Sequence, residues 1–494
     1  MAEQDFTARH AHEWDAVSIV RHLEEGATSS EAIVESLTAR INALDPPGTA
    51  TELRSIVAMA PDAMAQAIAA DVARRDGNVR SALHGVPVVI KDSIEAVGLP
   101  GTAGATALAN RPVAADAPLV KRLRDAGAII LASTNLSEWA NLRSTRSTSG
   151  WSAVGGLTAN PHHLDRTAGG SSSGSGAALA AMLAPLAVGT ETDGSITCPA
   201  SLNGVAGIKP TVGTIPTKGV VPISASQDSP GPMARTVADV ALLYEVLAAE
   251  SGVSQRVAAG ASGVRAGTSD ALRTGHPGTD ALFDDAVAAL GTCGVDVGAV
   301  EYTAATPEVH HAELTVLCCE MLDDLTAYLA ARGGEGPASL AEVIAFEDAH
   351  RDVELAFFGH ELFETAAASG GRASGDYAPA RAACVAWATA CLEAALLDRD
   401  VLVAPAWGPA WKSDLVLGDW DAPGSGITTA PSILGWPIAT VPMGVVDALP
   451  VGLSLVGRPG SEATLLAVAA AFEREVGLVA SGALAPGFLG PRRG

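Results

Sequence analysis

The chain has 494 residues, of which 48% are hydrophobic, and carries a formal net charge of −24 at pH 7. A chain of this length can bury a large core, either in two or more domains or in one large α/β enzyme. The negative charge would repel nucleic acids and anionic membranes, so we expect neither as a partner.

The N-terminal residues Met1 to Asp5 contain neither the basic nor the apolar segment of a secretory signal, and no later run approaches the ~18 apolar residues of a membrane span. We therefore expect a cytoplasmic protein that does not bind membranes and acts as a monomer or homodimer. The six cysteines are scattered without a Cys-x-x-Cys pair. Buried free thiols are expected rather than disulfides, because the chain already has an ample core.

Residues 1–75 are expected to form N-terminal helices on the outside of the core. Residues 17–43 show the pattern of two helices separated at Gly26. The second has a capping box, Thr28-Ser29-Ser30-Glu31, which can satisfy the free N–H groups of a first helical turn.

Residues 76–250 are expected to form the core proper. An apolar strand from about Leu83 to Lys91 is followed by a helix from about Ala115 to Ala126 and a strand from Ala128 to Leu131. This order implies two parallel strands joined by a right-handed crossover. The fold class is therefore α/β.

Lys91, at the end of the first apolar strand, is one of only five lysines. Burial disfavours an ammonium ion and can lower a lysine pKa by up to ~3–5 units, which would let the amine act as a general base. Arginine, the commoner basic residue here, cannot give up its proton. The alternative is a structural lysine that reaches solvent or pairs with Asp92.

Residues 169–200 combine a glycine- and serine-only loop with a helix from Ala177 to about Leu183, a strand from Leu186 to Val188 and a tight turn, Asp193-Gly194-Ser195. Such turns leave backbone N–H groups unpaired beside a serine, which is what an oxyanion hole requires. Glycine–serine runs also occur as flexible linkers, but linkers do not lie between apolar segments.

Gly170 to Gly174 also matches the G-x-S-x-G nucleophile elbow, with Ser172 as the nucleophile. An elbow requires a hydrophobic strand directly before it, whereas the preceding text from Thr158 to Asp165 has the composition of a loop. No lysine follows the glycines, so a phosphate-binding Walker motif is excluded.

The rest of the chain continues the α/β pattern after an interruption. A helix is expected from Thr236 to Glu250, capped by Thr236 and Asp239. Residues 251–395 are rich in alanine and acidic residues and are expected to be a helical insertion that covers the core. Residues 396–494 are the C-terminal part of the core, with strands and a helix expected at Asp400–Pro405, Pro437–Pro442, Val451–Val456 and Ser461–Val476.

Three of these segments together resemble the amidase signature family. The family has a lysine at the end of a G-V-P-x-x-x-K-D strand, a serine in a G-G-S-S loop and a nucleophilic serine in a G-S-I turn, which correspond here to Lys91, Ser171 and Ser195. The segments Asn203–Thr211 and Gly231–Asp239 match as well, so the likeness covers nearly the whole chain. The resemblance implies one amidase domain over residues 1–494, with a large mixed central β-sheet covered by helices on both faces.

A departure from the usual family text indicates a subgroup. Many members read D-T-G-G-S-I-R around the nucleophile, whereas Thr197 stands here in place of the arginine. Together with the segments Thr134–Asn141 and Ser149–Ser152, the sequence around Ser195 looks most like that of the bacterial peptide amidases, which remove the C-terminal carboxamide of peptides. The expected partner is thus a small-molecule or peptide amide.

The resemblance also implies a mechanism without cofactor or metal. Ser195 attacks the amide carbonyl, its proton passes through a cis-peptide Ser171 to neutral Lys91, and an acyl-enzyme forms. The oxyanion is expected to rest on the backbone N–H groups of Thr192, Asp193, Gly194 and Ser195. Asn141 and Arg143 are candidates for substrate binding, the latter as a structural or carbonyl-binding group rather than a carboxylate ligand.

Several alternatives stay open at this stage. A Ser-His-Asp triad or a metal site would use a histidine of the cover (His310, His311, His350 or His360), although no H-E-x-x-H spacing occurs. The chain could also be the glutaminase component of a tRNA-dependent amidotransferase, or an amidase or esterase acting on aryl or fatty substrates. A non-enzymatic scaffold is the last alternative, which an intact Lys91, Ser171 and Ser195 disfavours.

Overall fold

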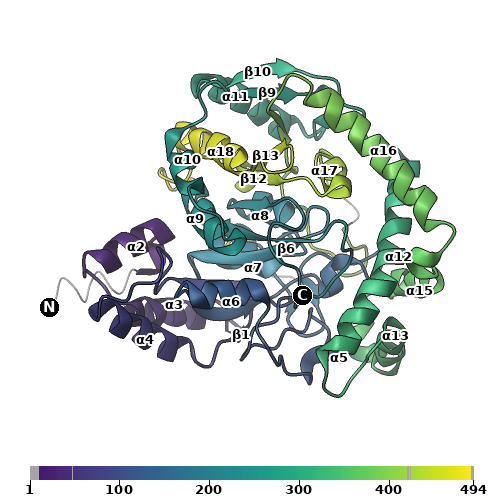
Figure 1. Ribbon diagram of the computed structural model, residues 1–494, viewed down its shortest axis with the longest axis horizontal. Coiled ribbons are helices and arrows are strands. Elements are labelled where there is room, and N and C mark those ends of the chain that lie inside the picture. Colours follow the sequence, from purple (N-terminus) through teal and green to yellow (C-terminus); the bar gives the residue numbers. More distant parts are fainter. Residues whose placement is uncertain (1–10, 47, 50, 420–421, 423, 491–494) are drawn as a thin grey trace.

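The computed structural model describes residues 11–490 except 47, 50, 420, 421 and 423. Met1 to Asp5 lie outside the described residues. An 11-stranded sheet runs through the molecule in the order β1-β3-β2-β6-β8-β7-β12-β13-β11-β9-β10 (Figure 1). Its strands are β1 (Ile56–Met59), β2 (Pro87–Lys91), β3 (Ile129–Thr134), β6 (Leu186–Glu191), β7 (Ala206–Lys209), β8 (Ser229–Ala234), β9 (Arg265–Thr268), β10 (Asp296–Ala299), β11 (Val401–Pro405), β12 (Ile438–Val446) and β13 (Leu449–Gly457). A separate two-stranded sheet comprises β4 (Trp151–Ser152) and β5 (Gly156–Leu157).

The sheet is mixed. β2 pairs in parallel with β3, as predicted from the strand–helix–strand order, and also in parallel with β6. In contrast, β6, β8, β7, β12, β13 and β11 pair antiparallel in succession. Both halves of the chain contribute strands, because β7 lies directly beside β12. The predicted α/β class with a large mixed sheet is therefore confirmed.

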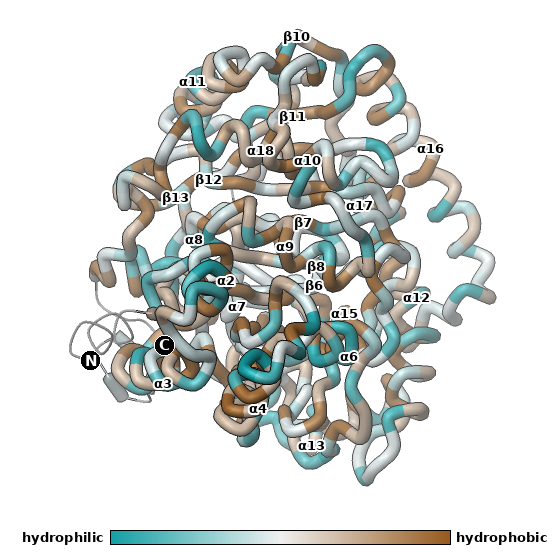
Figure 2. Tube along the Cα trace, turned by 60° about the vertical axis from the view of Figure 1, so that its left-hand side comes forward, coloured by the Kyte–Doolittle hydropathy of each residue, from teal (hydrophilic) through white to brown (hydrophobic). Residues whose placement is uncertain are grey.

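Helices flank the sheet on both faces. α8 and α18 both pack on β12 and β13, and α7 and α9 both pack on β6 and β8; α7 also packs against α8, and α9 against α18. Figure 2 shows hydrophobic stretches on interior strands such as β12 and mixed colours along surface helices such as α4, as expected when each surface helix buries one face. The α-helices are α2 (Ala16–Glu24), α3 (Ser30–Leu44), α4 (Ala63–Arg75), α5 (Thr106–Ala109), α6 (Pro118–Asp125), α7 (Ser173–Ala180), α8 (Thr197–Asn203), α9 (Val237–Ala248), α10 (Val253–Ala259), α11 (Pro277–Thr292), α12 (Pro307–Arg332), α13 (Leu340–Ala349), α14 (Arg351–Glu354), α15 (Glu361–Ala368), α16 (Tyr377–Ala395), α17 (Thr429–Leu434) and α18 (Glu462–Val476). The 3₁₀ segments are η1 (Ala11–Glu13), η2 (Glu138–Asn141), η3 (Asp270–Leu272) and η4 (Gly371–Ala373).

Two predicted helix caps differ in detail from the structure. α3 is capped by Ser29, whose hydroxyl accepts from the N–H of Ala32, rather than by Thr28. α9 is capped by Thr236 as predicted, but Asp239 does not close the box. Its carboxylate instead accepts from the N–H groups of Ala16 and Val17, and so ties the N-terminal helix α2 to the core.

The cover is less uniformly helical than predicted. Residues 251–395 include the long helices α12 and α16, which run side by side along one flank (Figure 1). The same stretch also contributes β9 and β10 to the edge of the main sheet, in parallel with β11. Between Leu340 and Ala368 the helical structure is divided into the three short helices α13, α14 and α15. No described helix is long and apolar enough to cross a membrane.

Candidate active site

The end of β2 places the amine of Lys91 inside the protein. All five residues of β2 are buried, and the side chain of Lys91 is 0% exposed. Its Nζ atom lies 2.6 Å from Oγ of Ser171 and 2.8 Å from Oγ1 of Thr190. Burial lowers the pKa of Lys91 to about 7, although the carboxylates of Asp228 and Glu191 act in the opposite direction. A substantial fraction of neutral amine is therefore present near neutral pH.

Ser171 lies at the start of the loop that leads into α7. The Gly170–Ser171 peptide bond is cis, and the Ser171 side chain is 0% exposed. α7 begins at Ser173, earlier than predicted. Gly174 permits this, because a Cβ atom there would lie 2.4 Å from the carbonyl oxygen of Ser55 and 2.5 Å from the backbone nitrogen of Asn135. The helix thus packs directly on the backbone beside the end of β3.

Ser195 lies in the turn between β6 and α8. Glu191 stabilises the turn. Its Oε2 atom accepts from the N–H groups of Ile196 (2.6 Å) and Thr197 (2.8 Å) and from the Thr197 hydroxyl (3.1 Å). The carbonyl of Ser195 accepts from the N–H of Ser172 at 3.0 Å. Two hydrogen-bonded segments therefore fix the position of the Ser195 backbone.

The backbone of this turn offers free donors. Among the described residues, the N–H groups of Thr192, Asp193, Gly194 and Ser195 have no hydrogen-bond acceptor. Gly194 has φ +80°, and a Cβ atom there would lie 3.3 Å from Cζ2 of Trp407, so the turn requires glycine. Unpaired donors beside a serine hydroxyl are the arrangement that stabilises a developing oxyanion.

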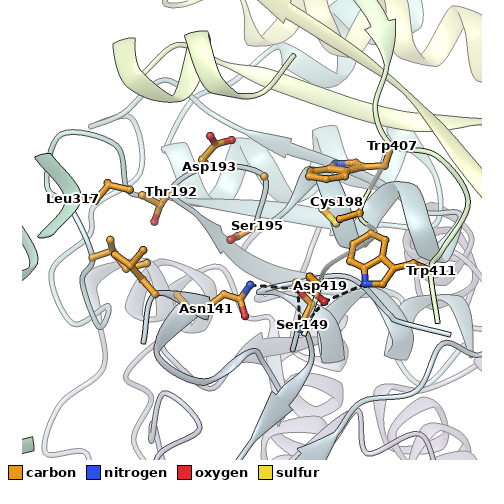
Figure 3. Close-up of a pocket in the computed structure, with 16 residues that line it drawn as sticks. Asn141, Ser149, Thr192, Asp193, Ser195, Cys198, Leu317, Trp407, Trp411 and Asp419 are labelled. Atoms are coloured by element: carbon orange, nitrogen blue, oxygen red, sulfur yellow. Dashed lines mark hydrogen bonds between the residues drawn. The ribbon is translucent and has the colours of Figure 1, made fainter. Parts of the chain in front are cut away.

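These groups line a cavity of about 330 Å³. Figure 3 shows Ser195 near its centre, with the indoles of Trp407 and Trp411 on one side and the carboxylate of Asp193 on another. Burial raises the pKa of Asp193. The labelled lining residues are Asn141, Ser149, Thr192, Asp193, Ser195, Cys198, Leu317, Trp407, Trp411 and Asp419.

Comparison with known proteins identifies the family of the chain. A model described as Amidase matches residues 32–466. The chain belongs to the amidase family. The enzyme is 39% identical to the native peptide amidase of Stenotrophomonas maltophilia, with a TM-score of 0.87 over 97% of this chain and 98% of that one. It is 40% identical to the peptide amidase PAM in complex with the competitive inhibitor chymostatin, with a TM-score of 0.88 over 94% and 97% of the two chains.

A second group of relatives is named as components of an amidotransferase. A glutamyl-tRNA(Gln) amidotransferase component from Symbiobacterium thermophilum is 32% identical over 496 residues, which cover 91% of this chain and 94% of that protein. The family assignment makes this chain an amidase, a hydrolase of C–N bonds.

The two candidate substrate-binding residues have different surroundings. Asn141 lines the cavity with φ +75°, and its amide donates to the Ser149 hydroxyl (3.4 Å) and to Asp419. Arg143 does not line this cavity. Its side chain is 0% exposed, donates to Glu138 and to the carbonyl of Glu354, and stacks over the ring of Phe358 at 4.5 Å.

The alternatives to a lysine-dependent site find less support in the structure. Ser172 is buried outside the cavity lining, and its hydroxyl is bonded to the backbone of Thr190. No histidine is among the described residues that line the cavity. The carboxylates of Glu138, Glu347 and Glu354 lie within 4.8 Å of one another, but Arg143 donates to Glu138 and His360 lies 2.8 Å from Glu347. Arg143 thus supplies a cationic group to that cluster, and the hydrogen bond to Glu347 raises the pKa of His360.

Several lining residues had no signal in the sequence. Trp407, Trp411 and Asp419 come from an irregular segment after β11 that contains no recognisable motif. Thr190 was missed as well, because it is the parallel register of β2 and β6, which aligns Ile90 with Val188 in the folded sheet, that carries Lys91 alongside the end of β6. Thr197, which stands where many family members have an arginine, has a local role here, because its hydroxyl and its N–H both donate to Glu191.

Proposed function

We propose that this amidase removes the terminal carboxamide of peptides or amino-acid amides. Ser195 is the nucleophile, Ser171 the proton relay and Lys91 the base. The observation that carries the proposal is the 2.6 Å contact between Lys91 Nζ and Ser171 Oγ, made by an amine that is fully buried and has a pKa lowered to about 7. A buried amine of this kind can accept a proton near neutral pH, which a serine nucleophile requires.

The reaction then proceeds through two half-reactions. Ser195 Oγ bonds to the carbonyl carbon while its proton passes to Ser171, whose own proton passes to Lys91. The carbonyl oxygen becomes an anion that accepts from the free N–H groups of residues 192–195. When the C–N bond breaks, Lys91 returns the proton through Ser171 to the nitrogen, and ammonia leaves. Water attacks the acyl-enzyme by the same route and releases the carboxylate.

The charge of the cavity favours an uncharged carboxamide over a free acid. Two carboxylates, Asp193 and Asp419, line it, and no lysine or arginine is among its described lining residues. A substrate carboxylate would therefore be desolvated without a cationic partner and close to like charges, which is costly. The likeness to two solved peptide amidases supports the same class of substrate.

A glutaminase function is the second candidate, since amidotransferase components are among the relatives. It would require a bound glutamine with its free α-carboxylate in or beside the same cavity. Arg143, the arginine nearest in sequence to the lining residues Asn141 and Leu142, is occupied by Glu138. We therefore favour the carboxamide hydrolase, and we propose that residues 1–494 act as one amidase domain with residues 251–395 as its cover.

The test is a panel of amides assayed for ammonia release. We expect a peptide amide to be hydrolysed, and the same peptide with a free C-terminus, and its internal peptide bonds, to remain intact. Ser195→Ala protein is the blank for contaminating activity. A preference for glutamine, for aryl anilides or for long-chain fatty amides over every peptide amide would overturn the proposed substrate class.

A further inference from the structure

Asp419 is a carboxylate in the wall of the cavity, and its hydrogen-bond partners among the described residues are neutral. Its carboxylate accepts from the N–H (3.1 Å) and hydroxyl (2.6 Å) of Ser149, from Nε1 of Trp411 (3.1 Å) and from the amide of Asn141. Within the described part of the chain, Asp419 has no ion pair with lysine, arginine or histidine. Neutral donors hold the carboxylate in place and leave its charge uncompensated.

The hydrogen bonds also fix how this charge faces the cavity. Ser149, Asn141 and Trp411 all line the same cavity as Asp419 and Ser195, so the carboxylate belongs to the lining and not to the core behind it (Figure 3). Burial raises the pKa of Asp419, while its donors act in the opposite direction. A cation brought into the cavity would relieve this desolvation, because an opposite charge favours the ionised carboxylate.

Two indole rings lie next to this carboxylate. The ring centroids of Trp407 and Trp411 are 6.4 Å apart and the rings are tilted by 46°, so they form two faces of one wall. Trp407 lies over Gly194 of the nucleophile turn, and Trp411 donates to Asp419. Indole faces attract cations through their electron-rich surface, most strongly where water is partly excluded. The Asp419 carboxylate and the two indole rings are thus both complementary to a cationic group.

We infer that Asp419, Trp407 and Trp411 form a subsite for an ammonium group carried by the acyl part of the substrate. The inference rests on the proposed function and narrows its substrate class to amides with a positive charge near the carboxamide. Two sources share this chemistry: the free α-ammonium of an amino-acid amide, and the side-chain ammonium of a lysine amide. The net charge of −24 would further attract such cations to the protein.

The test compares amides of matched shape. For the α-ammonium, phenylalaninamide is compared with 3-phenylpropionamide; for the side chain, N-acetyl-lysinamide is compared with N-acetyl-norleucinamide. We expect the wild-type kcat/KM to favour the cationic member of at least one pair by about tenfold or more, as a charged contact in a partly buried site would give. The pair that shows the preference identifies the source of the ammonium.

Asp419→Asn should abolish that preference, because it should lower kcat/KM for the cationic amide by about tenfold more than kcat/KM for its neutral partner. Asp414→Asn is the matched control, because Asp414 lies in the same segment, outside the cavity lining, and accepts from the N–H groups of Val416 and Leu417. The preference for an α-ammonium should also fade above pH ~8, where that group loses its proton, whereas a lysine preference should persist.

Equilibrium binding of the same pairs to Ser195→Ala protein separates this inference from the proposed function. Tighter binding of the cationic amide, lost in the Asp419→Asn, Ser195→Ala double variant, would support the subsite even if turnover failed. Equal binding and turnover of both members of each pair would overturn the subsite while leaving the amidase function intact. An equal loss of kcat/KM for cationic and neutral amides in Asp419→Asn would also overturn the subsite. Asp419 would then only support Ser149 and Trp411.

Discussion

Nζ of Lys91 and Oγ of Ser171 are 2.6 Å apart, and both side chains are completely buried. Neither residue is among the groups that line the cavity, whereas Ser195 is. In the mechanism that we propose, the proton that Lys91 exchanges with a substrate passes through the Ser171 hydroxyl. The proposed nucleophile and the proposed base therefore occupy different positions, and each can be tested alone.

The first prediction concerns the two serines. Ser195→Ala should abolish hydrolysis, and Ser171→Ala should reduce kcat by about 10²–10⁴-fold, because it interrupts proton transfer but keeps the nucleophile. Both variants should keep a cooperative thermal unfolding transition. Ser172→Ala is the matched control from the same loop, and its kcat should stay within about tenfold of wild type. If Ser172→Ala were instead the inactive variant, the elbow interpretation would be correct.

The second prediction concerns pH. The base must be neutral, so kcat/KM should rise with pH through about 7, the value to which burial lowers the pKa of Lys91, and then level off. The kcat/KM of Lys91→Arg should be lower than that of wild type by about 10³-fold or more, although the positive charge is kept, because guanidinium does not deprotonate. A rate that is flat from pH 5 to 9 would contradict the role of Lys91.

The same pKa has a consequence for stability. Between about pH 7 and the ordinary lysine value of 10.5, the unfolded chain binds a proton at Lys91 that the folded protein does not. This residue's contribution to the free energy of unfolding therefore becomes more favourable as pH rises through that window. Lys91→Met should consequently be most stabilising relative to wild type at or below pH 7, and the difference should shrink toward pH 10.5, as measured by denaturant unfolding.

The third prediction tests for a metal. Excess EDTA should leave kcat/KM for a peptide amide unchanged, because the chemistry proposed for Ser195, Ser171 and Lys91 uses only protein groups. Addition of zinc after dialysis should likewise have no effect. Loss of activity in EDTA that zinc restores would show that a metal takes part, and the glutamate cluster around Glu347 would then be the first place to examine.

The fourth prediction assigns Arg143 a structural role. Arg143→Met leaves the carboxylates of Glu138 and Glu354 buried without their partner, which should cost about 3–5 kcal/mol of unfolding free energy. The exposed Arg146 supplies the control, since Arg146→Met should change stability by less than about 0.5 kcal/mol. Neither change should let the enzyme cut a peptide with a free C-terminus. An altered ratio of amide to acid substrates at unchanged stability would show that Arg143 contacts the substrate.

Local sequence patterns predicted the parts of the fold that local physics determines. The residues directly before Lys91 form a buried strand because they are all hydrophobic. The glycines at 169, 170, 174, 176 and 194 permit close approaches that a side chain would block. In contrast, β9 and the edge strand β10 have only four residues each and no hydrophobic alternation. They exist because β11 offers β9 a parallel partner and β9 in turn pairs with β10, which is a tertiary effect that a sequence window does not contain.

The same distinction applies to the candidate site. Lys91, Ser171 and Ser195 could be picked out because each stands in a short text that resembles a known family. Asp419 and Trp407 lie in irregular chain more than 200 positions after Ser195, and only the folded sheet brings them beside it. The contribution to specificity that we propose for them therefore could not be anticipated from the sequence.

The last prediction concerns Glu191, a buried carboxylate under the nucleophile turn. Glu191→Ala leaves the N–H groups of Ile196 and Thr197 without their acceptor, which should cost about 1–3 kcal/mol of stability and allow Ser195 and the oxyanion donors to shift. We expect kcat to fall by about 10²-fold or more with little change in KM. Thr197→Val, which removes only the third hydrogen bond to Glu191, is the control and should cost no more than about 1.5 kcal/mol.

Glu191→Gln distinguishes the geometric role of this residue from its charge. The amide oxygen can still accept from the turn, so kcat at high pH should be closer to wild type than in Glu191→Ala. Because the Glu191 carboxylate raises the pKa of Lys91, its neutralisation should lower that pKa further and move the rise in kcat/KM to lower pH. A pH profile identical to wild type would show that Glu191 has no electrostatic influence on Lys91, and a shift to higher pH would contradict the assignment of Lys91 as the base.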